Sequence, residues 1–227
     1  MRFIFLLIFS FQVIHAQEEL KKKDEIIFFS LNHTFQIPEG DLKKRFGNNS
    51  NINAMIAYKF NNDLLFSIEG GAIFGASVKE NNLFEHMDGN NGNLISPNGE
   101  IPTIRLFQRG GHLDFNFGKF FKILNKKSES GILMTLGVGY LYHKILIETL
   151  TIELPQLSEE LLKGYDRLSG GILTKQFIGY LHFSKKNNIR YLLGFEFMQS
   201  ITKDLRKYNY TLQSNLDETR KDYLLGF

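Results

Sequence analysis

The sequence predicts an all-β protein, an antiparallel up-and-down barrel of about eight strands. Three observations predict this fold. From Glu25 onward, apolar and polar residues alternate with period two, as strand side chains alternate between the two faces of a sheet. Short segments rich in Asn, Asp and Lys separate some of these stretches and are typical of tight turns. Longer segments separate the others, so that short and long connections alternate along the chain.

Eight segments carry the strand pattern. They are residues 25–37, 52–60, 64–74, 111–123, 132–143, 171–183, 190–197 and 222–227. Most have about the 9–11 residues that a tilted membrane strand needs. The two parities are less distinct in the sixth segment, and the last segment is short. The sequence therefore leaves open whether the final strand is truncated.

The composition is that of a folded chain without disulfides. Among 227 residues there are 22 Phe, 9 Tyr and no Cys, and 43% of the residues are hydrophobic. Such a chain can bury enough apolar surface to offset its ordering entropy, which excludes intrinsic disorder. The lack of Cys excludes disulfides, thiolate metal sites and a Cys nucleophile. A net charge of +3 is too small to indicate nucleic acid as a partner.

The amino terminus has the features of a secretory signal peptide. Met1-Arg2 is a short positive start, residues 3–14 are almost entirely apolar, and Ala16 fits a cleavage site. The apolar run is too short for a membrane-spanning helix of about 20 residues. A buried amino-terminal strand is the alternative. We expect a signal peptide over residues 1–16, a charged lead-in over 17–24 and the barrel over 25–227.

The pattern of connections matches a membrane barrel. Short turns join the second segment to the third, the fourth to the fifth and the sixth to the seventh. The longer connections are residues 38–51, 78–110, 148–170 and 202–221. An outer-membrane barrel has short periplasmic turns and longer extracellular loops. With the lead-in in the periplasm, long and short connections fall where this topology requires.

The two faces of the predicted strands favour a transmembrane barrel over a soluble one. The apolar face is uniformly large, while the other face collects Gly, Ser, Thr and Asn with isolated charges, which a small barrel interior accepts if the charges pair. Aromatic residues near strand ends match interfacial girdles: Phe35, Phe60, Phe74, Tyr140, Tyr142 and Tyr191. Soluble lipocalin-like barrels usually carry a Trp in their first strand, and this chain has no Trp. A soluble secreted barrel remains the alternative.

Together these features resemble the small outer-membrane β-barrel proteins of Gram-negative bacteria, the OmpA/OmpX-like up-and-down barrels. The resemblance covers nearly all of residues 25–227. The stretch Leu154-Pro-Gln-Leu-Ser158, followed by Gly164-Tyr-Asp-Arg-Leu-Ser-Gly-Gly171, is similar to an uncharacterised subgroup without an established activity. The resemblance implies the cell outer membrane as location, export through a cleaved signal peptide, and outer-membrane lipid as a partner. The short closing segment 222–227 departs from such proteins, which usually continue through a full final strand.

Charged residues on the predicted inward faces are candidates for a charge network in the lumen. They are Lys59, Glu69, His112, Asp114, His143, Arg190 and Glu196. Unpaired buried charges cost several kcal/mol each, so we expect these residues to pair. A structural network that fills the lumen is one interpretation, and a proton or ion path is the other. About eight strands leave an interior that side chains fill, which favours the first.

We expect no catalytic, cofactor or metal site. Lipid-modifying barrels use a Ser or His with a carboxylate, but no spacing ties such residues together here. The residues of suitable type are His33, His143, Ser67, Ser169 and Glu196. Residues 88–93 contain oxygen ligands, yet an EF-type loop needs Gly at its sixth position, where Asn93 stands.

Residues 155–163 predict a short helix in a long connection. Its Leu157, Leu161 and Leu162 either pack against the barrel rim or form a partner-docking patch. We therefore expect a non-enzymatic outer-membrane barrel whose long extracellular loops act in structure, recognition, or an envelope or secretion assembly. A lipid-modifying enzyme and a narrow, porin-like pore are the alternatives.

Overall fold

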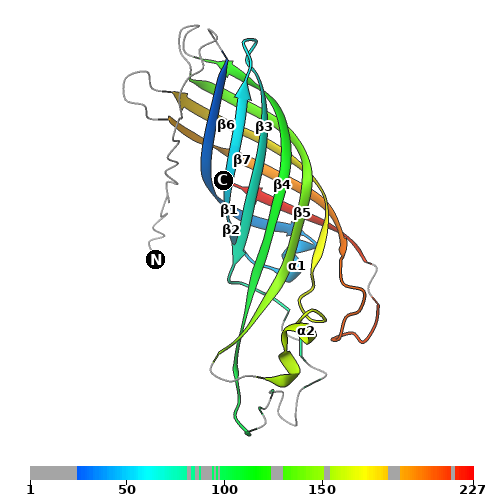
Figure 1. Ribbon diagram of the computed structural model, residues 1–227. Coiled ribbons are helices and arrows are strands. Elements are labelled where there is room, and N and C mark those ends of the chain that lie inside the picture. The colour runs from blue at the N-terminus through cyan, green and yellow to red at the C-terminus, as the bar shows by residue number, and fades with distance from the viewer. Residues whose placement is uncertain are drawn as a thin grey trace, which may run out of the picture.

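The computed structural model describes residues 25–80, 83–84, 87, 94, 96, 98–123, 130–150, 154–183, 190–215 and 218–227. Eight antiparallel strands close into a barrel, which confirms the predicted all-β fold (Figure 1). The strands are β1 (Ile26–Gly40), β2 (Asn49–Lys59), β3 (Leu64–Gly75), β4 (Thr103–Lys122), β5 (Gly131–Leu150), β6 (Ser169–Phe183), β7 (Arg190–Asp204) and β8 (Thr219–Gly226). The predicted signal peptide and lead-in lie outside the described residues.

Each strand pairs with the next strand in sequence, and β8 returns to β1. The ring closes through the pairs from Gln36↔Gly226 to Gly40↔Asp222. The tight turn between β2 and β3 has Asp63 at a φ of 62°, a conformation that Asp tolerates. In the same turn, the Asn62 Oδ1 atom accepts a hydrogen bond from the Leu64 backbone N–H at 3.2 Å. The structure therefore has a tight turn at the Asn and Asp residues that predict one.

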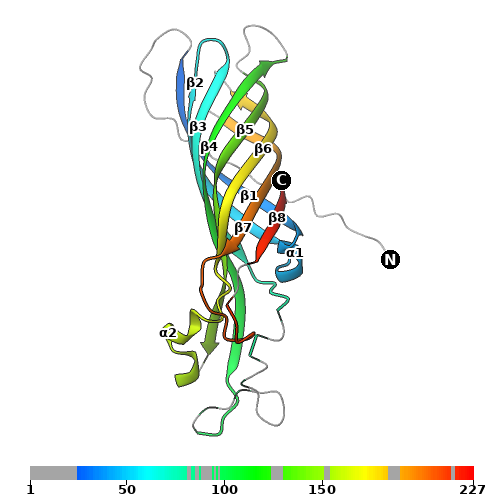
Figure 2. The same cartoon turned by 90° about the vertical axis from the view of Figure 1, so that its right-hand side faces the viewer.

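The long connections gather at one end of the barrel. Two short helices lie there, α1 (Leu42–Arg45) and α2 (Glu159–Leu162), and a 3-10 turn, η2 (Pro155–Leu157), precedes α2 (Figures 1 and 2). We call this end the loop end and the opposite end the turn end. Within the described ranges, no helix has the length and apolar character needed to cross a membrane.

β4 and β5 are longer than the sequence predicts. Each has 20 residues, and β4 begins at Thr103, inside the segment predicted as a long connection. Beyond the last pair of β3 with β4, Gly75↔Gln108, only β5 pairs with β4, as far as Thr103↔Leu150. This two-stranded ribbon projects from the loop end (Figure 2). One face of the ribbon is apolar and covered: Ile145 and Ile147 are buried, and Ile104 and Leu106 pack against the same apolar cluster.

The barrel interior is layered along its axis. An apolar cluster at the turn end is formed by Phe28, Met55, Ala57, Leu65, Phe120, Leu133, Leu181 and Leu192. A larger apolar cluster at the loop end joins barrel residues such as Leu141 and Leu173 to connection residues such as Phe46 and Tyr165. Polar and charged side chains lie between the two clusters. Side chains thus cross the lumen at each of these levels, as expected for eight strands.

The outer face of the barrel is apolar on every strand. Exposed residues include Phe29, Ile56, Ile68, Phe115, Leu136, Ile172, Phe195 and Leu225. On β4 the outward apolar run is bracketed by Arg109 and Lys119. Ten strand residues at about 3.4 Å each, tilted by about 45°, rise about 24 Å. This height matches the apolar band of about 25 Å on membrane barrels, and we call the surface the outer apolar belt.

One part of the belt is polar. Thr174 and Gln176 of β6 and Gln199 of β7 lie on the outward parity, and the Gln199 Nε2 atom donates a hydrogen bond to Gln176 Oε1 at 3.0 Å. Thr174 pairs with Val138 and Gln176 with Leu136, so both polar residues lie level with the middle of the belt. They explain why the sixth predicted segment has less distinct parities.

Candidate functional site in the barrel lumen

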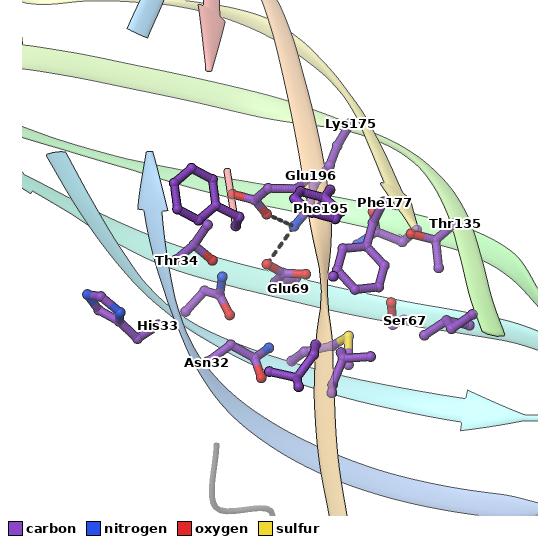
Figure 3. A pocket seen from close by; sticks show the side chains of 18 residues that line it. Asn32, His33, Thr34, Ser67, Glu69, Thr135, Lys175, Phe177, Phe195 and Glu196 are labelled. Atoms are coloured by element: carbon purple, nitrogen blue, oxygen red, sulfur yellow. Dashed lines mark hydrogen bonds and ion pairs between the residues drawn. The ribbon is translucent and has the colours of Figure 1, made fainter. Parts of the chain in front are cut away.

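The centre of the lumen is organised around Lys175 of β6, which is 2% exposed. Its Nζ atom lies 2.5 Å from Glu69 Oε1, 3.5 Å from Glu196 Oε2 and 3.7 Å from Asp114 Oδ2. Figure 3 shows the ammonium group between Glu69 and Glu196. These residues come from β3, β4, β6 and β7, so the ion pairs connect strands across the lumen. One cation thereby contacts three buried carboxylates and offsets part of the unfavourable free energy of their burial.

Polar side chains surround this central network. Asp114 Oδ1 lies 2.5 Å from His112 Nδ1, and Asp114 Oδ2 accepts a hydrogen bond from Asn116 Nδ2 at 2.7 Å. The other ring nitrogen of His112 lies 3.0 Å from Asn51 Nδ2. The network therefore extends from β4 to β2 and includes both predicted and unpredicted residues.

A second polar group lies nearer the loop end. His143 Nε2 is 2.9 Å from Asp222 Oδ2, and Thr202 Oγ1 donates to the same oxygen at 2.5 Å. Arg220 pairs with Asp204 and donates to Ser169 Oγ at 2.8 Å. These contacts connect β8 to β5, β6 and β7, and so stabilise the closing strand.

Ion pairs also join the long loops at the loop end to one another. Arg45 of α1 lies 2.6 Å from Glu80, and Arg167 lies 3.0 Å from the other oxygen of that carboxylate. Burial lowers the pKa of the Arg45 guanidinium, although the charge of Glu80 opposes that effect. Asp166 and Arg206 form a bidentate pair at 2.6 and 3.1 Å, and this hydrogen bonding raises the pKa of Arg206. The loop end is therefore a connected structure.

The seven charged residues predicted for the lumen do not form one network. Glu69, Asp114, Glu196 and His112 lie in the central network, and His143 lies in the group nearer the loop end. Lys59 lies at the turn end, with its Nζ atom 2.7 Å from Asp63 Oδ1. The side chain of Arg190 lies outside the described part of the chain. Alternation assigns a residue to the inward face but carries no information about its level along the axis.

The three leucines predicted for packing or docking differ in burial. Leu157 is 6% exposed in the loop-end cluster, and Leu162 packs against that cluster. Leu161 is 38% exposed. Leu157 of η2 and Leu162 of α2 therefore pack on the rim, and Leu161 of α2 stays at the surface.

The five residues considered for an enzyme form no side-chain hydrogen bond with one another in the described structure, although His143 and Ser169 are register partners on β5 and β6. His33 is exposed on the outward face of β1, and Ser67 is buried in the lumen. His143, Ser169 and Glu196 contact Asp222, Arg220 and Lys175, respectively. The described residues contain a Ser–His contact that the sequence reading missed, 3.0 Å between Ser130 Oγ and His182 Nδ1. In the described ranges no group of three or more His, Cys, Asp or Glu residues could hold a metal ion.

A cavity of about 340 Å³ borders the central network on its turn-end side. Its polar lining includes Glu69, Lys175 and Glu196, and its apolar lining includes Met55 and Leu133. The cavity also borders His33, Thr34, Leu193, Phe195 and Phe227, which belong to β1, β7 and the last residue (Figure 3). It therefore extends from the network to the barrel wall between β1 and β7.

Comparison with known proteins gives a fold likeness and no family. No family model matches the chain, and no curated protein is similar to it in sequence. The crystal structure of Ail, the attachment invasion locus protein of Yersinia pestis, is similar at 12% identity with a TM-score of 0.39, over 89% of this chain and 95% of that chain. The structure of Ail in complex with the heparin analogue sucrose octasulfate gives 13% identity and a TM-score of 0.35 over the same shares. The barrel assignment rests on the closed ring of strand pairs, independently of this likeness.

Proposed function

We propose that this chain is a non-enzymatic outer-membrane β-barrel protein of a Gram-negative envelope, exported through a signal peptide. The outer apolar belt carries the proposal. Every strand presents large apolar side chains outward, such as Leu136 at 68% and Ile172 at 71% exposure. A soluble protein rarely exposes so large a continuous apolar surface, whereas acyl chains would cover it. A soluble secreted barrel would need the opposite arrangement, with its apolar face inward.

The side chains that cross the lumen favour a structural or recognition role over a pore. Apolar clusters occupy both ends of the interior, and ion pairs around Lys175 cross its middle. A water-filled path for ions would have to pass all three layers. The dispersed contacts of the candidate Ser and His residues likewise favour a non-enzymatic role.

The loop end is the surface that we assign to recognition of an envelope or secretion component. Leu161, Leu205, Tyr208 and Leu212 are exposed there, and we call them the loop-end patch. The connections that carry them are held together, because the Tyr210 N–H donates to the Gly164 carbonyl at 3.1 Å. Ion pairs within these connections keep the patch ordered. An ordered apolar surface at the membrane-distal end of a barrel is typical of a protein contact.

Two measurements test this function. Cell fractionation and heat-modifiable gel mobility follow membrane insertion, and recovery of the folded chain from the soluble fraction would contradict the membrane location. Affinity purification from detergent-solubilised envelopes then compares a Leu161→Ser/Leu212→Ser variant with Ile101→Ser, an exposed control in another long connection. We expect partner capture to fall at least tenfold for the double variant only. Equal capture by both variants would contradict recognition through the patch.

A further inference from the structure

The outward face of β6 and β7 carries polar side chains inside the outer apolar belt. These residues are Thr174 and Gln176 of β6 and Gln199 of β7, and we call them the polar stripe. Along β6 the stripe is flanked by outward Ile172 and Ile178, which are 71% and 44% exposed. The stripe therefore lies within the surface that acyl chains would cover, and not at its edge.

The stripe has the same setting on β7. The outward residues on either side of Gln199 are Phe197 and Ile201, and Ile201 is 60% exposed. Gln199 pairs with Thr174 of β6 on one side and with Tyr223 of β8 on the other. The stripe therefore lies on the part of the barrel where the ring of strand pairs is closed.

Hydrogen bonds within the stripe satisfy only part of its polar groups. The Gln199 Nε2 atom donates to Gln176 Oε1 at 3.0 Å, and the Thr174 hydroxyl donates to the Gln199 backbone carbonyl at 3.4 Å. Among the described residues, Gln176 Nε2 and Gln199 Oε1 have no hydrogen-bond partner. One donor group and one acceptor thus remain at the outward surface. A side-chain amide without partners is unfavourable in hydrocarbon, and acyl chains offer neither donors nor acceptors.

We propose that two copies of this chain associate side by side in the membrane through their polar stripes. The proposal rests on the membrane location proposed above. Because copies of a membrane protein share one orientation, the two-fold axis of such a dimer runs along the membrane normal, and residues meet at equal depth. Gln176 and Gln199 lie at a similar depth, since their amides hydrogen-bond to each other. Gln176 of each copy can therefore donate to Gln199 of the other copy.

A second copy supplies both missing partners at once. Each copy contributes one free donor group, on Gln176, and one free acceptor, on Gln199, so that two new hydrogen bonds join four amides in a closed ring. This self-complementarity is what an interface with two-fold symmetry requires. A different protein would need its own amide pair at the same depth. Gln side chains also form hydrogen bonds between the spans of other membrane proteins.

The shape of the stripe fits a contact between two barrels. Two convex barrels touch along a narrow line, so that only neighbouring strands of each barrel come into contact. The polar side chains lie on two strands that pair with each other, β6 and β7. Ile172, Ile178 and Ile201 surround them and would pack against the second copy, which adds van der Waals contact to the hydrogen bonds.

Cross-linking tests the proposal, since the chain has no Cys of its own. The full chain with Ile172→Cys is folded into phospholipid vesicles and treated with a short bismaleimide. The control is Ile56→Cys, an outward residue that is 60% exposed on β2, on the opposite side of the ring from β6. We expect at least tenfold more covalent dimer with Ile172→Cys than with the control.

A second pair of variants tests the amides themselves. Gln176→Leu/Gln199→Leu in the Ile172→Cys chain removes the hydrogen bonds and keeps the apolar neighbours, so we expect the covalent dimer to fall at least tenfold. This variant makes the belt more uniformly apolar and should still insert into vesicles. The matched control Phe66→Leu/Phe117→Leu changes two outward register partners on β3 and β4 and should leave the dimer unchanged.

Other results would overturn the proposal. Equal cross-linking at positions 172 and 56 would indicate random collisions, and an undiminished dimer in the double leucine variant would show that the amides do not hold the copies together. In intact outer membranes, a product of Ile172→Cys whose mass is not that of a dimer would show that a different protein covers the stripe. Gel mobility separates the two hypotheses: an inserted barrel without dimer refutes only the dimer, and a chain that does not insert refutes the membrane function.

Discussion

At the scale of single residues, Lys175 supplies the cation that contacts three carboxylates in the lumen. In Lys175→Met, Glu69, Glu196 and Asp114 keep their burial but lose their cation. We expect a loss of about 3–5 kcal/mol in the free energy of unfolding, because removal of one partner leaves buried charge uncompensated. Urea unfolding followed by far-UV circular dichroism measures this loss. Lys175→Arg, which keeps the charge, should lose less, and equal losses would show that the ammonium charge is not the cause.

Gly71 is a second lumen residue for which substitution should be costly, because there is no room for a side chain. A Cβ atom at this position would lie 2.3 Å from His112 Nε2 and 2.6 Å from Asn51 Oδ1. We expect Gly71→Ala to lower the free energy of unfolding by about 1–3 kcal/mol through overpacking. Its neighbour Gly70 faces outward, and a Cβ atom there would meet nothing closer than 3.7 Å. Gly70→Ala should therefore stay within about 0.5 kcal/mol of the natural chain in the same unfolding experiment.

The sequence does not show the level of a side chain along the barrel axis or its contacts on other strands, and this limited the prediction of single residues. Alternation identifies Glu69, Asp114 and Glu196 as inward residues because charge cannot face acyl chains on an apolar strand face. It overlooks Lys175, the cation between them, because outward Thr174 and Gln176 obscure the parity of β6. To predict contacts between strands that are distant in sequence, one must know the register in which the strands pair. A local sequence pattern does not contain this information.

At the scale of elements, the β2–β3 turn is a pH-sensitive part of the turn end. Partial burial raises the pKa of Asp63, but the pair with Lys59 outweighs this effect, so the pKa lies below its usual value of 3.8. The ionised carboxylate therefore stabilises the fold above pH 3.8, and this contribution is lost as the pH falls through the lower pKa of the folded state. We expect it to be less than about 1 kcal/mol at neutral pH, since the pair is near the surface.

Comparison with Asp63→Asn isolates this contribution, because Asn also tolerates the positive φ of the turn. The difference in unfolding free energy between the two chains should be constant from pH 5 to 8 and should shrink below pH 4. A difference that does not change with pH would mean that Asp63 acts through turn geometry alone.

Among the elements, those that line the lumen were predictable and the ribbon of β4 and β5 was not. β1, β2 and β3 each separate apolar outward residues from lumen-facing residues, so period-two alternation identifies them. Residues 103–107 of β4 lie outside the ring, where Arg105 is exposed and Ile104 half-buried. Their pairing partner on β5 determines their conformation, and the partner cannot be read from β4 itself.

At the scale of the whole molecule, we expect the outer apolar belt to determine the depth of the barrel in the membrane proposed above. Leu136 lies in the middle of the belt, and Phe121 lies near its turn-end edge, two residues beyond Lys119. We expect Leu136→Arg to lower the free energy of unfolding in vesicles by about 2–4 kcal/mol and Phe121→Arg by about 0–1 kcal/mol. Equal losses at the two positions would contradict the assigned depth.

The ribbon formed by the ends of β4 and β5 has a consequence for steric access. Its five outermost pairs, from Phe107↔Leu146 to Thr103↔Leu150, extend about 17 Å past the last residues that pair with β3. A large soluble macromolecule that contacted the tip of this ribbon would therefore keep its own bulk away from the outer apolar belt. Shortening the ribbon would bring the same contact against the rim of the barrel without altering a residue of the barrel wall.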